Sequence, residues 1–204
     1  MRSEKIGYLL GQQCAPILAG IKPSNLLIVE PGNQKELSCI LRGTGIRSCC
    51  LYASGKKDYL LLFEEEKLQK LLREKEVNEY LRKCGYVSNN VKEVLRRLAW
   101  RFAEYKKNKQ EFPHEMGILF GYPLKDVQGF IENQGKNFKL SGYWKVYDDV
   151  DYAGKVFYLY ECVKHIVLKL CREGVCISDI CRVCRDWKTG EKVQRVLERT
   201  RSRV

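Results

Sequence analysis

The chain has 204 residues, of which 45% are hydrophobic and 30% are charged, and its formal net charge at pH 7 is +12. A chain of this length and composition can bury a substantial core, which excludes extensive disorder. It contains no apolar run as long as a membrane span and no secretory leader pattern, so we expect no membrane partner and a cytoplasmic location. Its ten cysteines are therefore expected to be reduced thiols.

The positive charge is unevenly distributed along the chain. Residues 1–110 hold twenty-one basic and twelve acidic side chains, residues 111–172 hold eight of each, and residues 173–204 hold eight basic and five acidic ones. The central segment is neutral, so any attraction of polyanions is expected to come from the segments on either side of it.

The first half of the chain predicts helices that alternate with short strands. Pro16, Gly20 and Pro23 are expected to end the first helix early, because proline lacks a backbone donor and glycine lowers helix stability. Two runs rich in strand-forming residues flank SGKK, which predicts a β-hairpin. In chain order we expect a helix at 3–13, a strand at 26–29, a helix at 34–42, strands at 46–53 and 58–64, and helices at 64–75, 77–84 and 89–109.

The second half centres on the segment EFPHEMGILFGYPLKDVQGFIENQG, residues 111–135. The apolar run from Met116 to Phe120 predicts a strand, Gly121-Tyr122 a turn, and Pro123 the first turn of a helix. After Cys171 the sequence becomes turn-like and rich in cysteine. In chain order we expect a strand at 116–120, a helix at 123–133, a strand at 143–147, a helix at 151–172 and a basic amphipathic helix at 191–204.

This interleaving of elements predicts a mixed fold, α/β or α+β. We expect a mixed sheet of about four to five short strands with helices packed on it. The main domain is predicted to span residues 1–172, and residues 173–204 to form a small, basic, Cys-rich helical appendage.

Three motifs carry a resemblance to a known family. They are CAPILAGIKPSNL at 14–26, FPHEMGILFGYPLKDVQGFI at 112–131 and GYWKVY at 142–147. Together they resemble a family of uncharacterised bacterial proteins, a domain of unknown function found mostly in anaerobes, over roughly residues 5–165. The resemblance implies no established activity.

A thiol site that pairs Cys14 with His114 is the first candidate. An imidazole beside a cysteine stabilises the thiolate, and Glu115 or Asp126 would orient the imidazole. These four residues form the candidate catalytic set. The competing interpretation makes Cys14 a packed small residue and His114 a hydrogen-bonded residue at a strand edge.

A pocket for a small anionic ligand is the second candidate. Free backbone N–H groups at the Gly121-Tyr122-Pro123 corner would attract phosphate or carboxylate, and glycine permits a close approach. Pro123 removes one donor and Asp126 supplies negative charge, which favours a purely structural corner. The candidate ligand-binding residues are Lys22, Asn25, Gly121, Tyr122, Lys139 and Lys145.

A metal site is the third candidate. Four thiolates suffice for a structural zinc or an iron–sulfur cluster, and the last two have the two-residue gap that such sites use. The other gaps match no familiar zinc ribbon, so unligated thiols are the alternative, and His165 is a weaker alternative ligand. The candidate ligands are Cys171, Cys176, Cys181 and Cys184.

Binding of nucleic acid or of an acidic partner is the fourth candidate. Clustered basic residues on the 89–109 helix would neutralise phosphates, and Trp100 or Trp187 could stack on bases. A solvated basic face is the alternative, since no nucleic-acid-binding motif accompanies the charge. The candidate contacts are Arg96, Arg97 and Arg101.

The function that we expect first is a small-ligand-binding or thiol-dependent catalytic pocket where residues 14–25, 112–126 and 139–147 meet. Polar, glycine and proline residues concentrate in these three segments. The alternatives are a binding module that uses the basic 89–109 helix with the C-terminal tail, and a non-catalytic scaffold. Neither the residues nor the resemblance assigns a reaction.

Overall fold

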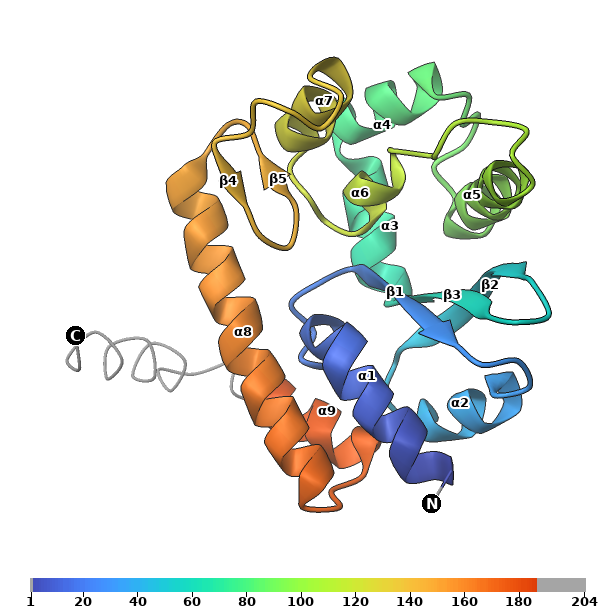
Figure 1. The fold of residues 1–204 in the computed structure, drawn as a ribbon, viewed down its shortest axis with the longest axis vertical. Coiled ribbons are helices and arrows are strands. Elements are labelled where there is room, and N and C mark those ends of the chain that lie inside the picture. The colour runs from blue at the N-terminus through green and yellow to red at the C-terminus, as the bar shows by residue number, and fades with distance from the viewer. Residues whose placement is uncertain (1, 187–204) are drawn as a thin grey trace.

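The computed structural model describes residues 2–186, whose helices and strands form a mixed fold with two small sheets (Figure 1). The predicted fold class is thereby confirmed. The strands are β1 (Ser24–Val29), β2 (Arg47–Ala53), β3 (Asp58–Phe63), β4 (Leu140–Ser141) and β5 (Lys145–Val146). The helices are α1 (Arg2–Leu18), α2 (Gln34–Ile40), α3 (Glu65–Arg73), α4 (Lys75–Lys83), α5 (Val91–Lys106), α6 (Met116–Leu119), α7 (Leu124–Glu132), α8 (Val150–Arg172) and α9 (Ile177–Asp186).

The larger sheet has buried side chains on both faces of its central strand. Its strand order is β1-β3-β2 with antiparallel pairing throughout, so the predicted hairpin from β2 to β3 is confirmed. Successive side chains of a strand point to opposite faces. On the central strand, Leu60 and Leu62 therefore enter one core cluster, whereas Leu61 and Phe63 enter the other.

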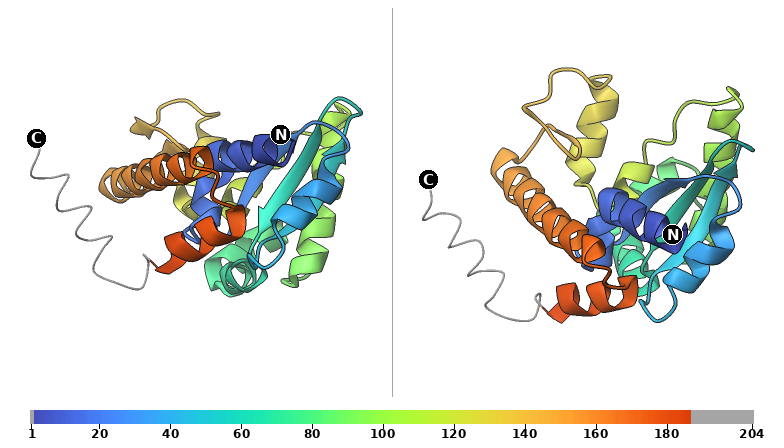
Figure 2. Two further views of the ribbon diagram at one scale, coloured as in Figure 1. Left: turned by 90° about the horizontal axis from the view of Figure 1, so that it is seen from below. Right: turned by 60° about the horizontal axis from the view of Figure 1, so that its bottom comes forward.

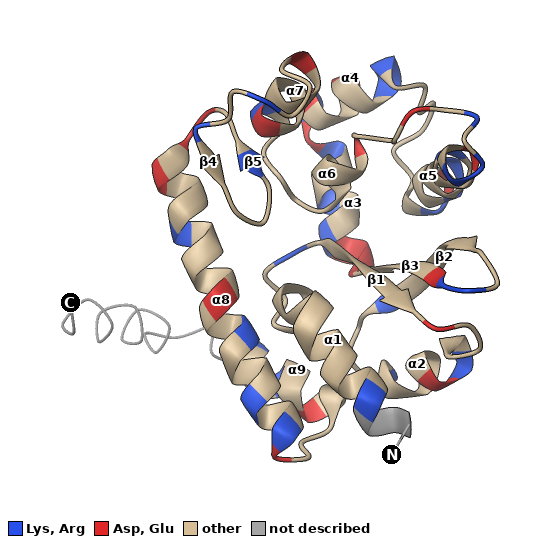
Figure 3. Ribbon diagram, viewed as in Figure 1, with Lys and Arg blue, Asp and Glu red and all other residues tan. Residues whose placement is uncertain are grey.

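Different helices cover the two faces of this sheet. One cluster joins the sheet to α1, α2 and α9, and α8 packs along α1 (Figures 1 and 2). The other cluster joins the sheet to α3, α4, α5 and α6. The apolar face predicted for the helix at 89–109 is buried as expected, and Lys and Arg are spread over several helices, including α3, α5 and α8 (Figure 3).

The β4–β5 hairpin lies apart from the main sheet, between α7 and the first half of α8 (Figure 1). Leu140 pairs with Val146, and Ser141 pairs with Lys145. Trp144 and Val146 form a third core cluster with Ala153 and Tyr160 of α8. The hairpin is thus held by side-chain packing, since two strands of two residues each are too short to be stable alone.

Two predictions about secondary structure are wrong. The first helix does not end before Pro16 but continues to Leu18. Ala15 and Ile17 beside the proline are completely buried, and this burial offsets the roughly 3 kcal/mol that an interior proline costs. The run 116–120 forms the short helix α6 rather than a strand, because a short apolar run fits either structure until its neighbours are known.

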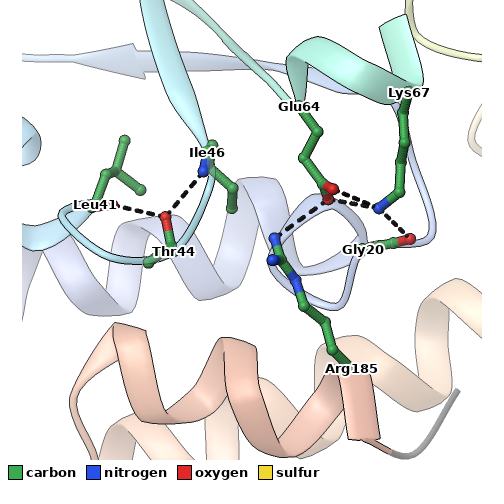
Figure 4. Close-up of polar contacts among 7 residues, drawn as sticks. All are labelled: Gly20, Leu41, Thr44, Ile46, Glu64, Lys67 and Arg185. Carbon is green, nitrogen blue, oxygen red and sulfur yellow. Dashed lines mark hydrogen bonds and ion pairs between the residues drawn. The ribbon is translucent and has the colours of Figure 1, made fainter. Parts of the chain in front are cut away.

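Helix α9 packs into the main core cluster. Its residues Ile177, Ile180 and Cys181 are buried in the same core cluster as α1, in contrast to the boundary expected at residue 172. The Arg185 guanidinium at its end lies 3.3 Å from the Glu64 carboxylate (Figure 4). The helix expected at 191–204 lies outside the described residues.

A polar cluster around the Glu64 carboxylate connects α9, α3 and the end of α1. Besides Arg185 of α9, it contacts the Lys67 amine of α3 at 2.6 Å, and that amine also donates to the carbonyl oxygen of Gly20, just after α1, at 2.8 Å (Figure 4). On the neighbouring loop, the Thr44 hydroxyl donates to the Leu41 carbonyl oxygen at 2.7 Å. The Arg185–Glu64 contact adds a directional constraint to the apolar packing of α9.

Candidate functional site

A cavity of about 360 Å³ lies where α6, α7 and the β4–β5 hairpin meet. Five aromatic rings contribute to its wall, and four polar side chains, those of His114, Asp126, Ser141 and Lys145, also line it. The five rings belong to Phe112, Phe120, Tyr122, Phe130 and Trp144, and the other lining residues are Gly117, Val127 and Gly142.

Asp126 fixes the hairpin against α7. Its buried carboxylate accepts a hydrogen bond from the Trp144 indole nitrogen at 2.7 Å and from the backbone amides of Tyr147 and Asp148 at 2.8 and 3.0 Å. The Trp144 ring then stacks on Tyr122, with 5.0 Å between ring centroids. Asp126 thus organises the wall of the cavity, whereas the sequence suggested that it would orient an imidazole.

Glycine at position 117 allows α6 to approach α7 closely. A Cβ atom there would lie 3.0 Å from Cγ2 of Val127 and 3.2 Å from Cδ2 of Tyr122. These distances are shorter than ordinary van der Waals contacts between carbon atoms. The absence of a side chain at Gly117 therefore lets the two helices and the Tyr122 ring meet at the cavity.

His114 and Lys145 supply nitrogen atoms to the cavity. The imidazole lies between Phe112 and Phe130, 5.3 and 5.2 Å from them between ring centroids, and its nitrogens make no hydrogen bond to any group in residues 2–186. The Lys145 amine donates to the carbonyl oxygen of Gly135 at 2.5 Å. An ammonium has three N–H donors, so Lys145 keeps donors for a ligand.

Cys14 lies in the main core, outside the cavity. Its completely buried thiol contacts the Leu26 carbonyl oxygen at 3.7 Å and the Asn25 amide nitrogen at 3.6 Å. Burial raises the pKa of Cys14 to about 12, although Lys22 and Asn25 act in the opposite direction. The group is therefore a protonated thiol at neutral pH, and the predicted thiolate–imidazole pair with His114 is not formed.

Glu115 also has a structural role in this fold. Its buried carboxylate lies 2.9 Å from Nε of Arg101 and accepts a hydrogen bond from the Tyr86 hydroxyl at 2.9 Å. Burial raises the pKa of Tyr86, and the Glu115 charge adds to that shift. Glu115 thus joins α6 to α5 and does not orient His114.

The Gly121-Tyr122 corner has no free amide for an anion. The Gly121 amide donates to the Ile118 carbonyl oxygen at 2.8 Å, and the Tyr122 amide donates to that of Gly117 at 3.0 Å. Of the six predicted ligand-binding residues, only Tyr122 and Lys145 line the cavity. The Asn25 amide donates to the Gln13 carbonyl oxygen at 2.7 Å, and the Lys139 amine donates to that of Asp148 at 3.1 Å.

Lys22 contacts the wall of the cavity from outside. Its buried amine lies 5.2 Å from the centroid of the Phe120 ring and 5.0 Å from that of Tyr122, although Lys22 itself does not line the cavity. The Tyr160 ring lies on another side at 5.8 Å. Burial lowers the pKa of this amine to about 8, and Cys14 acts in the opposite direction.

The four cysteines predicted to bind metal are not arranged as a ligand set in the described residues. Cys181 and Cys184 are buried in the core, the Cys171 thiol contacts the Gly7 carbonyl oxygen, and Cys176 is exposed beside Asp179. Within residues 2–186, no group of three or more His, Cys, Asp or Glu side chains is arranged to hold a metal ion. This arrangement gives no support to the predicted zinc or iron–sulfur site.

The arginines predicted to bind nucleic acid differ in their surroundings. Arg101 pairs with Glu115, which neutralises its charge within the fold, and it also donates to the Cys84 carbonyl oxygen at 3.0 Å. Arg96 and Arg97 are exposed on α5. The Arg97 guanidinium lies 4.6 Å from the Trp100 ring centroid.

The residues that sequence reasoning missed are aromatic. Phe112, Phe120, Phe130 and Trp144 were not selected as site residues, yet all four line the cavity. The signal was the repeated occurrence of aromatic residues in the segment from 112 to 147. Such residues are ordinary core components, so their convergence on one cavity follows only from the positions of α6, α7 and the hairpin.

The fold and the cavity define a mixed α/β protein with an aromatic-walled pocket. The chain matches a family model described as "Protein of unknown function (DUF3793)" over residues 10–181, and it belongs to this family. The match extends into α9, beyond the span that the three motifs suggested. No curated protein and no solved structure matches the chain. No helix in the described part of the chain is both long enough and apolar enough to span a membrane.

Proposed function

We propose that this protein binds a small planar aromatic molecule that carries an acidic group, in the cavity beside the β4–β5 hairpin. The observation that carries the proposal is the cavity wall itself, in which five aromatic rings surround a space of about 360 Å³. Ligand pockets typically enclose roughly 300–1,000 Å³ and combine apolar walls with a few polar groups. Stacking on such walls favours a planar, apolar ligand.

The charges around the cavity support an anionic ligand. The Lys145 ammonium lines the cavity, and it also lies 5.7 Å from the Phe130 ring centroid. The Asp126 carboxylate already accepts three hydrogen bonds, from the Trp144 indole and from the backbone amides of Tyr147 and Asp148. A carboxylate on the ligand would therefore meet Lys145 without competition from a protein carboxylate.

Lys22 strengthens this preference from behind the wall. A cation over one face of an aromatic ring attracts π-electron density toward that face. The other face of Phe120 then becomes a better partner for an electron-rich or anionic ring. Both effects, from Lys22 and from Lys145, favour an aromatic acid over a neutral or cationic aromatic molecule.

Isothermal titration calorimetry with naphthoate and its neutral analogue naphthylmethanol tests the proposal. We expect naphthoate to bind with one site per chain. Lys145→Gln should weaken naphthoate about tenfold, equivalent to about 1.4 kcal/mol, and should leave naphthylmethanol nearly unchanged. Phe130→Ala should weaken both compounds, because it removes a stacking surface from the cavity.

Lys139→Gln is the matched control for Lys145→Gln. Both amines extend from the hairpin region and donate to a backbone carbonyl oxygen, but Lys139 does not line the cavity. The control should bind naphthoate as the unchanged protein does. The proposal is contradicted if neither compound binds at millimolar concentration, or if both lysine variants weaken naphthoate equally.

A further inference from the structure

A second concave surface lies where the loop after α4 meets α5. This groove encloses about 460 Å³ and shares no lining residue with the aromatic cavity. Its residues come from the 85–88 loop and from the outer face of α5. They are Gly85, Tyr86, Val87, Ser88, Glu93, Val94, Arg96, Arg97 and Trp100.

The groove exposes apolar side chains. Val87 is 91% exposed and Trp100 is 46% exposed, although both residue types are normally buried. Val87 lies on the 85–88 loop and Trp100 lies on α5, so the two apolar groups come from different sides of the groove. An apolar side chain of a partner that entered the groove would remove both from water, which is favourable.

Arg97 is held in position for recognition of an anion. Its guanidinium stacks on the Trp100 ring, 4.6 Å from the centroid, and a Cβ atom at Gly85 would lie only 3.2 Å from Nη2 of Arg97. The guanidinium is thus packed between an indole ring and a backbone segment. A planar group that is already oriented loses less side-chain entropy when it binds a carboxylate.

The positive charge of the groove is not neutralised within the fold. Across residues 2–186, neither Arg96 nor Arg97 has an ion-pair partner, whereas the nearby Arg101 is paired with Glu115. Glu93 supplies the single acidic side chain among the lining residues. The groove therefore combines two free guanidinium groups with exposed apolar surface.

We propose that this groove binds an acidic protein segment, whose carboxylates pair with Arg96 and Arg97 while an apolar side chain of the segment packs against Val87 and Trp100. Charge complementarity selects an acidic partner, and the exposed valine selects one that carries apolar residues. Bidentate pairing of arginine with carboxylate supplies the directional part of the recognition.

Single-stranded nucleic acid fits these observations less well. Binding of that kind uses aromatic faces on which bases stack and a track of cations along the backbone. Here a face of Trp100 is occupied by Arg97, and Arg101 is already paired with Glu115.

Calorimetric titration of the full chain with unlabelled synthetic peptides tests the proposal. The probe is a short peptide of Asp, Glu and Leu, compared with one in which Ser replaces Leu and one in which the amides Asn and Gln replace the acids. A single-stranded oligothymidylate is the fourth titrant. We expect the first peptide to bind at low salt, the two altered peptides to bind about tenfold more weakly or not at all, and added salt to weaken binding.

Variants of exposed residues locate the binding without disturbing the core. Arg96→Gln/Arg97→Gln should weaken the acidic peptide about tenfold or more, and Val87→Ser should weaken it severalfold. Lys92→Gln/Lys109→Gln removes the same charge from exposed positions that do not line the groove, and should change affinity less than twofold.

Three results would overturn the proposal. One is the absence of heat on titration with the acidic peptide at low salt. Another is equal weakening by the two double variants, which would indicate a general effect of positive charge. The third is tighter binding of oligothymidylate that Arg96→Gln/Arg97→Gln abolishes, which would assign the groove to nucleic acid. None of these results depends on ligand binding in the aromatic cavity.

Discussion

The Asp126 carboxylate accepts a hydrogen bond of 2.7 Å from the indole nitrogen of Trp144, and this contact joins α7 to the β4–β5 hairpin. We expect Asp126→Asn to destabilise the protein by about 2–3 kcal/mol. The NH2 group of the asparagine side chain would then face one of the N–H donors that the carboxylate now accepts, and that donor would lose its partner. Urea unfolding measures the change. Asp148→Asn, at an exposed position, should cost under about 1 kcal/mol, and equal costs would contradict the role given to Asp126.

Gly121 is predicted to be intolerant of a side chain for two separable reasons. Its φ is +80°, and a Cβ atom there would lie 2.8 Å from Cδ of Pro23. Gly43 has a similar φ of +78°, but a Cβ atom at Gly43 would have no neighbour within 4 Å. We expect Gly43→Ala to cost about 1 kcal/mol from backbone strain, and Gly121→Ala to cost clearly more in urea unfolding. Similar costs would show that the contact with Pro23 is unimportant.

Lys22 is expected to make stability depend on pH in the alkaline range. Burial lowers its pKa from 10.5 to about 8, so between these values the unfolded chain binds a proton that the folded protein lacks. The contribution of Lys22 to the free energy of unfolding therefore rises as the pH increases from about 8 toward 10.5. The rise between pH 7 and pH 10 is about 2 kcal/mol.

The variant Lys22→Met isolates this contribution. The raised pKa of Cys14 acts in the opposite direction above pH 9, but it is present in both proteins and largely cancels in the difference. Relative to Lys22→Met, the unchanged protein should therefore gain stability as the pH rises from 7 to 10. A difference in unfolding free energy that is constant across this range would contradict the lowered pKa.

Ile180 tests whether α9 belongs to the main core. The residue is completely buried in the cluster that contains α1, whereas Val183 on the same helix is 37% exposed. We expect Ile180→Ala to lower the free energy of unfolding by about 3 kcal/mol, and Val183→Ala to lower it by under about 1 kcal/mol. If Ile180→Ala left the main unfolding transition unchanged, α9 would behave as an appendage.

Part of the candidate site could be predicted from the sequence. The segment 112–131 was selected, and His114, Tyr122, Asp126 and Lys145 do line the cavity. Cys14 was selected for the same site because a cysteine near an imidazole is reactive, but it is buried in a different cluster. A pairing between residues about a hundred positions apart is set by the packing of whole helices, which residue type alone does not encode.

The sequence by itself determined the features that depend on near neighbours in the chain. The spacing of apolar residues predicted α5, and the two strand-forming runs around SGKK predicted the β2–β3 hairpin. The tertiary structure alone decided that 116–120 is helical, that α9 enters the core and that aromatic rings from four segments enclose one cavity. The reason is physical: periodicity reports the face that an element buries, whereas the partner of that face depends on contacts between distant parts of the chain.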